Sequence, residues 1–72
     1  MPFVDVSVIE DELSPEQAER LIQEITDAVT SVTSEKLHDV TWVTIREVKS
    51  GHWGIGGRAV GLADVKRLMG EG

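Results

Sequence analysis

The order of apolar residues constrains this chain most, because it describes a strand, a helix and a second strand. Val4, Val6 and Val8 alternate with other residues across residues 3–9, as in a strand. Residues 40–48 are again strand-like and rich in β-branched side chains. Between them, apolar residues recur at helical spacing, at Ala18, Leu21, Ile22, Ile25, Ala28, Val29 and Val32. The pattern predicts an α/β fold in which one main helix connects two parallel strands.

The helix start is marked by Ser14-Pro15-Glu16-Gln17. Serine can cap a helix, proline fits the first helical position, and Gln17 lies where a capping box requires it. We expect the helix to end near Thr33 and residues 34–39 to form a loop.

The small size of the chain predicts association. It has 72 residues and no cysteine, so a single domain over residues 1–72 must fold without disulfides near the lower size limit. One helix covers one face of a two-stranded sheet, and we expect the other face to expose several valines or isoleucines. An isolated strand pair is marginal in water. We therefore expect an obligate oligomer, with sheets joined edge to edge and stacked face to face.

Composition excludes several classes of partner. A formal charge of −6 disfavours nucleic acid and anionic membranes, both of which favour basic patches. Two histidines are too few for a histidine-rich metal cluster. No apolar run has signal-peptide length or approaches the ~20 residues of a membrane span. We expect a cytoplasmic protein without metal, nucleic-acid or membrane partners.

Pro2 follows Met1 and opens the first strand. Removal of Met1 would make Pro2 a free secondary amine, and a terminal amine has a pKa near ~8 in a model peptide. Burial in an apolar pocket would lower that pKa, and a base that titrates near the working pH is well suited to proton transfer. The alternative is that Pro2 only opens the strand.

The segment after the second strand reads Gly51-His52-Trp53-Gly54-Ile55-Gly56-Gly57. Four glycines in seven residues indicate turns and close backbone approach. A phosphate-binding loop would need Gly-Lys-Ser/Thr, which is absent. In the remaining tail, a short amphipathic helix is possible from the spacing of Leu62, Val65, Leu68 and Met69.

These features together resemble the 4-oxalocrotonate tautomerase family, from Pro2 through Gly57. The resemblance implies a βαβ subunit with a hairpin-rich C-terminal segment, assembled as a homohexamer that is a trimer of dimers. It implies an amino-terminal proline that acts as general base and then acid, without metal or organic cofactor. It also implies a site built from more than one subunit, with an aromatic residue at the position of Trp53 beside the proline.

Two arginines of the family are missing here. Members acting on dicarboxylates use one in the connection after the first strand, which here reads Glu10-Asp11-Glu12-Leu13, and one where this chain has Trp42. A charge-assisted hydrogen bond contributes roughly 1.5–3 kcal/mol, and a preorganised donor to an oxyanion about 3 kcal/mol of barrier. We therefore expect a monoacid or neutral enol/keto substrate, such as an arylpyruvate, rather than a dicarboxylate.

Five further residues are candidates for the site, each with a structural alternative. Trp53 and Trp42 are candidate apolar walls, with core or interface packing as the alternative. Arg46, on the same strand face as Trp42, and Arg58 are candidate replacements for the missing arginines, or else surface salt-bridge residues. His52 is a candidate acid, base or donor, or else a surface residue.

Two other functions stay open. The same fold can hydrate or dehalogenate small unsaturated acids, with Glu12 activating water, although the arginines for that chemistry are lacking. The chain can also be a non-catalytic scaffold, a ligand binder, or one subunit of a mixed hexamer whose partner supplies arginines. Retained Met1 on the native protein would favour a non-catalytic role.

Overall fold

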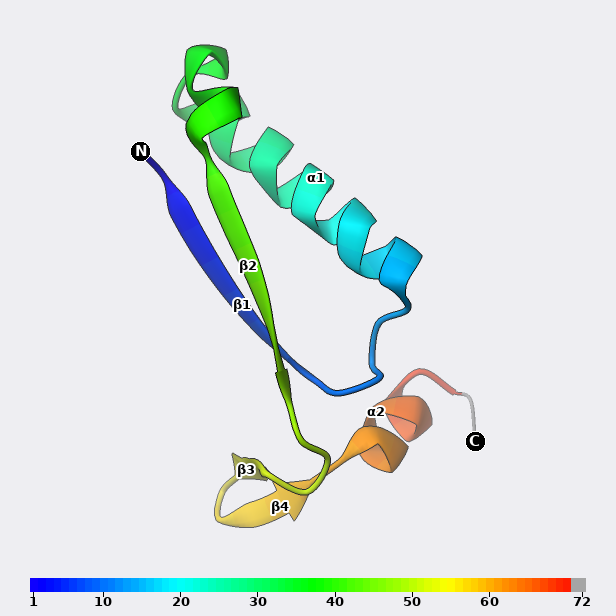
Figure 1. Ribbon diagram of the computed structural model, residues 1–72. Coiled ribbons are helices and arrows are strands. Elements are labelled where there is room, and N and C mark those ends of the chain that lie inside the picture. Colours follow the sequence, from blue (N-terminus) through cyan, green and yellow to red (C-terminus); the bar gives the residue numbers. More distant parts are fainter. Residues whose placement is uncertain (71–72) are drawn as a thin grey trace.

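The computed structural model describes residues 1–70 and contains two separate two-stranded sheets (Figure 1). Its elements are β1 (Phe3–Ile9), α1 (Pro15–Val32), the 3-10 helix η1 (Glu35–Val40), β2 (Trp42–Val48), β3 (Trp53–Ile55), β4 (Arg58–Val60) and α2 (Leu62–Leu68). β1 and β2 are parallel, in a register that pairs Phe3 with Trp42 and Ile9 with Val48. The strand–helix–strand unit predicted from the sequence is therefore confirmed.

The start of α1 is the predicted capping box. The backbone N–H of Gln17 donates to Ser14 Oγ over 3.1 Å, and the backbone N–H of Ser14 donates to Gln17 Oε1 over 2.9 Å. Pro15 is the first helical residue, and Thr33 is the C-cap. Both ends of the helix thus lie where the sequence predicts them.

The segment after α1 differs from the prediction. Residues 34–39 were expected to be a loop, but a 3-10 helix covers Glu35–Val40, and β2 begins at Trp42 rather than at Val40. Ser34 stabilises this short helix, since its Oγ accepts the N–H of Lys36 and its carbonyl accepts the N–H of Leu37. Thr41 then closes it by donating its hydroxyl to the Leu37 carbonyl over 2.8 Å.

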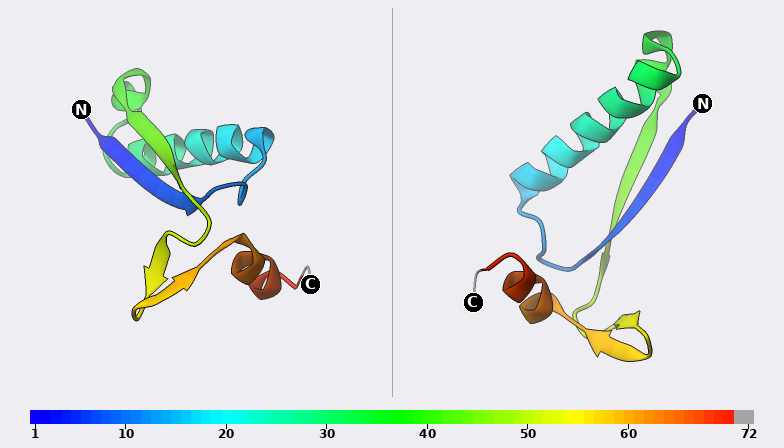
Figure 2. Two further views of the ribbon diagram at one scale, coloured as in Figure 1. Left: turned by 60° about the horizontal axis from the view of Figure 1, so that its bottom comes forward. Right: turned by 180° about the vertical axis from the view of Figure 1, so that it is seen from behind.

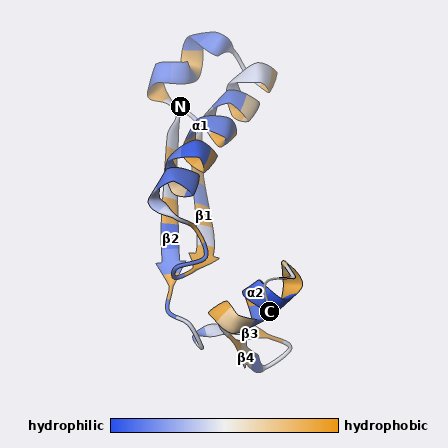
Figure 3. Ribbon diagram, turned by 90° about the vertical axis from the view of Figure 1, so that its right-hand side faces the viewer, coloured by the Kyte–Doolittle hydropathy of each residue, from blue (hydrophilic) through white to orange (hydrophobic). Residues whose placement is uncertain are grey.

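The helix α1 covers the face of the β1–β2 sheet that carries the alternate valines (Figures 1 and 2). Figure 3 shows hydrophobic and hydrophilic stretches alternating along α1, as in an amphipathic helix. The predicted apolar stripe is only partly buried, because Ile22, Ala28 and Val32 are exposed.

The most buried helical residues are two threonines that the apolar pattern omits. Thr26 and Thr30 are 9% and 1% exposed. Their hydroxyls donate to the carbonyls of Ile22 and Thr26, four residues earlier, over 2.8 and 2.9 Å. A threonine satisfied in this way can bury its methyl group without leaving an unpaired polar atom.

The uncovered face of the β1–β2 sheet is also different from the expectation. It was predicted to expose valines or isoleucines, whereas Val4 and Val6 of β1 lie half-buried on the α1 side. The exposed side chains are an aromatic pair, Phe3 and Trp42, and a polar group that includes Asp5. Strand alternation explains this result, because every second residue of β1 and β2 turns away from α1.

The hairpin β3–β4 and helix α2 form the C-terminal part that the sequence indicates. Gly56 and Gly57 connect the two strands with φ values of 59° and 81°. A two-residue hairpin loop with two positive φ values favours glycine, because other residues are strained there. The tail helix predicted from Leu62, Val65, Leu68 and Met69 is confirmed as α2, which ends at Leu68 with Met69 as its C-cap.

The chain is elongated and buries few apolar side chains. Its radius of gyration is 14.7 Å and its extents are 42 × 24 × 18 Å, whereas a compact domain of this length has a radius of gyration of about 11 Å. Within residues 1–70, the buried hydrophobic residues are Val8, Ile9 and Val60. Exposed apolar surface is therefore available for another chain. None of the helices in this part of the chain combines the length and apolar character needed to cross a membrane.

The capping box gives a test of how α1 is stabilised. We expect Ser14→Ala to lower the free energy of unfolding by about 1 kcal/mol, because the N–H of Gln17 loses its acceptor. Urea unfolding at fixed protein concentration measures this change. Ser31→Ala is the matched control, since Ser31 is an exposed residue inside α1 where alanine is favourable. Equal stability of the two variants would contradict this role for Ser14.

Candidate functional site

Pro2 lies in a small hollow at the start of the parallel sheet. This N-terminal hollow, of about 300 Å³, is lined by Met1, Pro2, Phe3 and Trp42. Pro2 is half-buried, and its carbonyl accepts the N–H of Trp42 over 3.0 Å, which joins it to the parallel ladder. The rings of Phe3 and Trp42 meet edge to face, with centroids 6.5 Å apart and an interplanar angle of 85°. The backbone ladder therefore holds Pro2 beside two aromatic side chains.

A polar cluster follows on the same exposed face. The Asp5 carboxylate accepts the Thr44 hydroxyl over 2.7 Å and Arg46 Nε over 2.8 Å. The Thr44 hydrogen bond, followed by the Arg46 hydrogen bond and charge, holds the pKa of Asp5 below its ordinary value. Arg46 shares the face of Trp42, as predicted, but its Nε is bound to Asp5 rather than directed at the N-terminal hollow.

The other predicted site residues lie at the opposite end of the chain (Figures 1 and 2). Trp53 is half-buried in β3, paired with Val60 of β4. His52 is exposed, and Arg58 donates to Asp64 over 3.2 Å. A seven-residue strand spans about 20 Å, which separates this end from Pro2. Within one chain, the structure therefore brings Pro2 and Trp42 together but not Trp53, His52 or Arg58.

Glu12, the candidate for activating water, has a local structural contact. Its Oε1 accepts the backbone N–H of Ile9 over 3.1 Å, where β1 ends. It therefore satisfies a backbone donor at the end of β1 farthest from Pro2.

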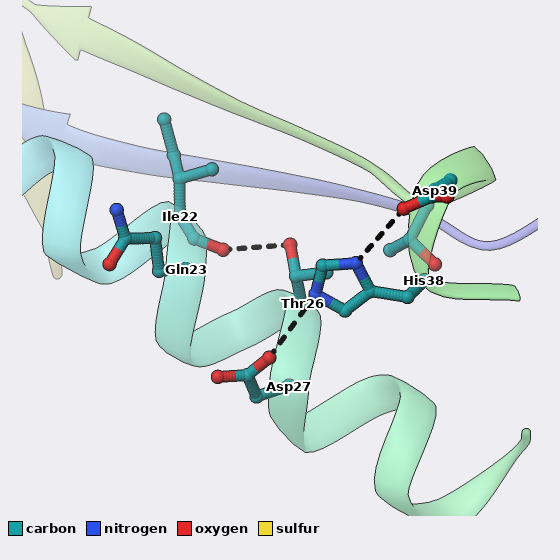
Figure 4. Close-up of a pocket in the computed structure, with 7 residues that line it drawn as sticks. Ile22, Gln23, Thr26, Asp27, His38 and Asp39 are labelled. Carbon is teal, nitrogen blue, oxygen red and sulfur yellow. Dashed lines mark hydrogen bonds and ion pairs between the residues drawn. The ribbon is translucent and has the colours of Figure 1, made fainter. Parts of the chain in front are cut away.

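A second hollow was not indicated by the sequence. It lies between α1 and η1, has a volume of about 470 Å³, and includes Ile22, Gln23, Thr26 and Thr41 in its lining (Figure 4). Figure 4 shows His38 between two carboxylates: its Nε2 is 3.4 Å from Asp27 Oδ1, and its Nδ1 is 3.4 Å from Asp39 Oδ1. Only tertiary structure could reveal this group, because Asp27 and His38 come from different helices.

The carboxylates change the titration of His38. The hydrogen bond with Asp39 is the largest contribution that raises the pKa of His38; desolvation opposes it, and Asp27 adds a further increase. Among residues 1–70, no group of three or more metal-ligating side chains is placed to hold a metal ion. We therefore interpret the cluster as an ionic contact between α1 and η1.

This contact predicts a pH-dependent contribution to stability. A histidine whose folded pKa is raised stabilises the fold fully below its unfolded pKa of about 6.5, and the contribution is lost as pH rises through the folded pKa. We expect the loss of stability between about pH 5.5 and about pH 8 to be smaller in His38→Gln than in wild type. Urea midpoints across this range measure it, with His52→Gln as control. Identical pH profiles for wild type and His38→Gln would contradict the prediction.

Comparison with known proteins agrees with this architecture. Residues 2–63 match the family described as "Tautomerase enzyme". A probable tautomerase from Dickeya dadantii is 38% identical over 60 residues, covering 83% of this chain and 88% of that protein. A probable tautomerase from Staphylococcus aureus is 39% identical over 57 residues, covering 79% of this chain and 90% of that protein.

Solved structures show the same fold. A 4-oxalocrotonate tautomerase isozyme from Methylibium petroleiphilum superposes with a TM-score of 0.73 at 29% identity, over 81% of this chain and 90% of that one. The structure of the Staphylococcus aureus relative gives a TM-score of 0.72 at 36% identity, with the same coverage of 81% and 90%. The βαβ unit with its C-terminal hairpin is thus a tautomerase-type subunit. The chain belongs to the tautomerase family, within its 4-oxalocrotonate tautomerase group, and this membership supports an isomerase-type activity.

Proposed function

We propose that this protein is a cofactor-independent tautomerase in which Pro2, freed by removal of Met1, is the general base and then the acid. The reaction is an enol–keto or 1,3-proton transfer on a small carbonyl acid. The observation that carries the proposal is the position of Pro2, half-buried in the N-terminal hollow beside the rings of Phe3 and Trp42. Met1 is 82% exposed, so a processing enzyme can reach it.

The chemistry follows from the nature of a terminal secondary amine. Its pKa in water is near ~8, and the apolar side chains of Phe3 and Trp42, which remain when Met1 is removed, penalise the ammonium form and move the pKa toward the working pH. The neutral nitrogen takes a proton from the enol oxygen or from a carbon next to the carbonyl. The resulting ammonium returns a proton to the other end of the conjugated system, so the product is an isomer of the substrate and Pro2 is regenerated.

The side chains of the hollow favour an aryl monoacid over a dicarboxylate. Phe3 and Trp42 offer edges and faces on which an aromatic ring can pack. The lining of the hollow contains no cationic side chain that could pair with a second carboxylate. An arylpyruvate-like enol or keto acid therefore fits the proposed site best.

The proposed assembly is a homo-oligomer, with a hexamer built as a trimer of dimers as the expected form. Support comes from the elongated chain and from its exposed apolar side chains. A second copy could also bring Trp53, His52 or Arg58 to the Pro2 site, whose lining within one chain does not include them. In that arrangement Trp53 is a second apolar wall, and Arg58, Arg46 or His52 is the donor to the substrate oxygen.

The first test changes the base. We expect Pro2→Ala to slow the ketonisation of phenylenolpyruvate at least about 100-fold, because it replaces a secondary amine with a primary amine of different pKa and geometry. Ultraviolet absorbance follows the reaction, and intact mass establishes that Met1 is absent. Pro15→Ala is the matched control, since Pro15 is the other proline of the chain and begins α1. Equal rates for wild type and Pro2→Ala, both without Met1, would refute the proposal.

The second test concerns the aromatic wall. We expect Trp42→Leu to raise KM for phenylenolpyruvate about 3- to 10-fold, because an aromatic pair contributes about 0.5–1.5 kcal/mol beyond burial. Steady-state kinetics with an alkyl enolpyruvate is the control, and its KM should change less. A similar change for both substrates would argue against aromatic contact at Trp42.

A non-catalytic or mixed-hexamer subunit is the second candidate function. It is favoured by the composition of the N-terminal hollow, whose lining of Met1, Pro2, Phe3 and Trp42 contains no charged side chain. Native mass spectrometry of protein from its own host separates the two proposals. Retained Met1 or a co-purifying paralogue would support this second candidate. The hydratase or dehalogenase alternative is weaker, because Glu12 is bound to the N–H of Ile9.

A further inference from the structure

The hairpin and α2 lie at the end of the chain opposite Pro2 and Phe3 of β1 (Figures 1 and 2). A third hollow is lined by residues of these two elements. We call it the arginine hollow; it has a volume of about 300 Å³, and its lining includes Ile55, Arg58, Asp64, Val65, Arg67 and Leu68. Three of the seven basic residues of this acidic chain lie between residues 58 and 67. Two of them, Arg58 and Arg67, line the hollow.

The two arginines converge on one carboxylate oxygen. Asp64 Oδ1 accepts Nη2 of Arg58 over 3.2 Å and Nη2 of Arg67. Asp64 Oδ2 accepts the backbone N–H of Gly61 over 2.9 Å, which anchors the carboxylate at the start of α2. This N–H is the largest contribution that keeps the pKa of Asp64 below its ordinary value, so the carboxylate stays charged at neutral pH. Two guanidinium groups and one carboxylate leave a local charge of about +1.

Among residues 1–70, Asp64 is the carboxylate that pairs with these two arginines. A guanidinium carries five N–H groups, and each arginine uses one nitrogen for Asp64. The side chains of Arg58 and Arg67 are 72% and 64% exposed. A planar fork of this kind suits a carboxylate, which can accept two parallel hydrogen bonds.

The rest of the lining is apolar and accessible. Ile55 and Leu68 are 64% and 88% exposed, and Val65 of the same lining is half-buried. A positive charge beside an apolar wall is complementary to a carboxylate attached to a hydrophobic group. A compact dianion would gain less, since it would leave the apolar wall unused and meet the charge of Asp64.

We propose that the arginine hollow is a binding site for a small monocarboxylate with an apolar or aromatic group. Binding of such an acid stands independently of Pro2. The further statement that this acid is the enol or keto acid of the reaction rests on the proposed function. The N-terminal hollow contains the base but no cationic side chain, whereas the arginine hollow contains cations for the carboxylate. A second copy of the chain is needed to bring the two together.

The test uses hydrocinnamate as the probe and its neutral analogue, hydrocinnamyl alcohol, as the reference. Titration of the full-length protein is followed by backbone amide NMR. We expect saturable shifts at Ile55, Arg58 and residues 64–68 with the acid. Arg58→Gln and Arg67→Gln should each weaken binding about tenfold, in line with the loss of a charge-assisted hydrogen bond. The alcohol should bind at least about tenfold more weakly than the acid for the same reason.

Arg20→Gln is the matched control, because Arg20 is an exposed arginine of α1 paired with Glu24, outside the hollow. Leu68→Ser should lower the affinity for hydrocinnamate about threefold or more, because it removes apolar surface from an exposed position. The affinity for acetate should not change. Shifts that map elsewhere, equal affinity for acid and alcohol, or an equal effect of Arg20→Gln would each overturn the inference.

Pro2→Ala separates this inference from the proposed function. It should keep the affinity for hydrocinnamate at the arginine hollow while losing turnover. Wild-type turnover without binding at the hollow would overturn only the carboxylate site. Binding at the hollow without any turnover by wild-type protein lacking Met1 would overturn only the proposed reaction.

Discussion

The coverage of one sheet face by a single helix governs the rest of this structure. A two-stranded parallel sheet has two faces, and α1 packs on the face of Val4, Val6 and Ile45. The other face is exposed to solvent and carries an aromatic pair beside an ionic cluster. Because so little apolar surface is buried within residues 1–70, exposed apolar side chains are left that contacts with another chain would bury.

The same geometry divides the chemistry of the chain between its two ends. The start of the parallel ladder holds Pro2 in apolar surroundings, and the hairpin with α2 holds Arg58 and Arg67 in a positively charged hollow. A proton transfer on a carbonyl acid benefits from both ends, since Pro2 would move the proton and the two arginines would neutralise the anion. A strand length of about 20 Å keeps them apart in one chain, so association would serve catalysis as well as stability.

Aspartates determine which arginines are available in this acidic chain. Asp5 binds Arg46 through Nε on the open face of the sheet, and Thr44 adds a hydrogen bond to the same carboxylate. Asp64 instead binds the tips of two arginines and leaves a local excess of positive charge. One carboxylate neutralises Arg46, whereas Arg58 and Arg67 share a single carboxylate, so Arg58 and Arg67 are the better prepared pair for an anion.

The sequence alone determined the elements whose signals are local. Alternating valines, the Ser14 capping box and the glycine pair at residues 56–57 specify strand, helix and hairpin, because each depends on neighbours a few residues apart. Only the tertiary structure decided which threonines of α1 are buried, that His38 meets Asp27, and that Arg58 and Arg67 share one carboxylate. The physical reason is that burial and charge pairing depend on how the elements pack, which no local spacing specifies.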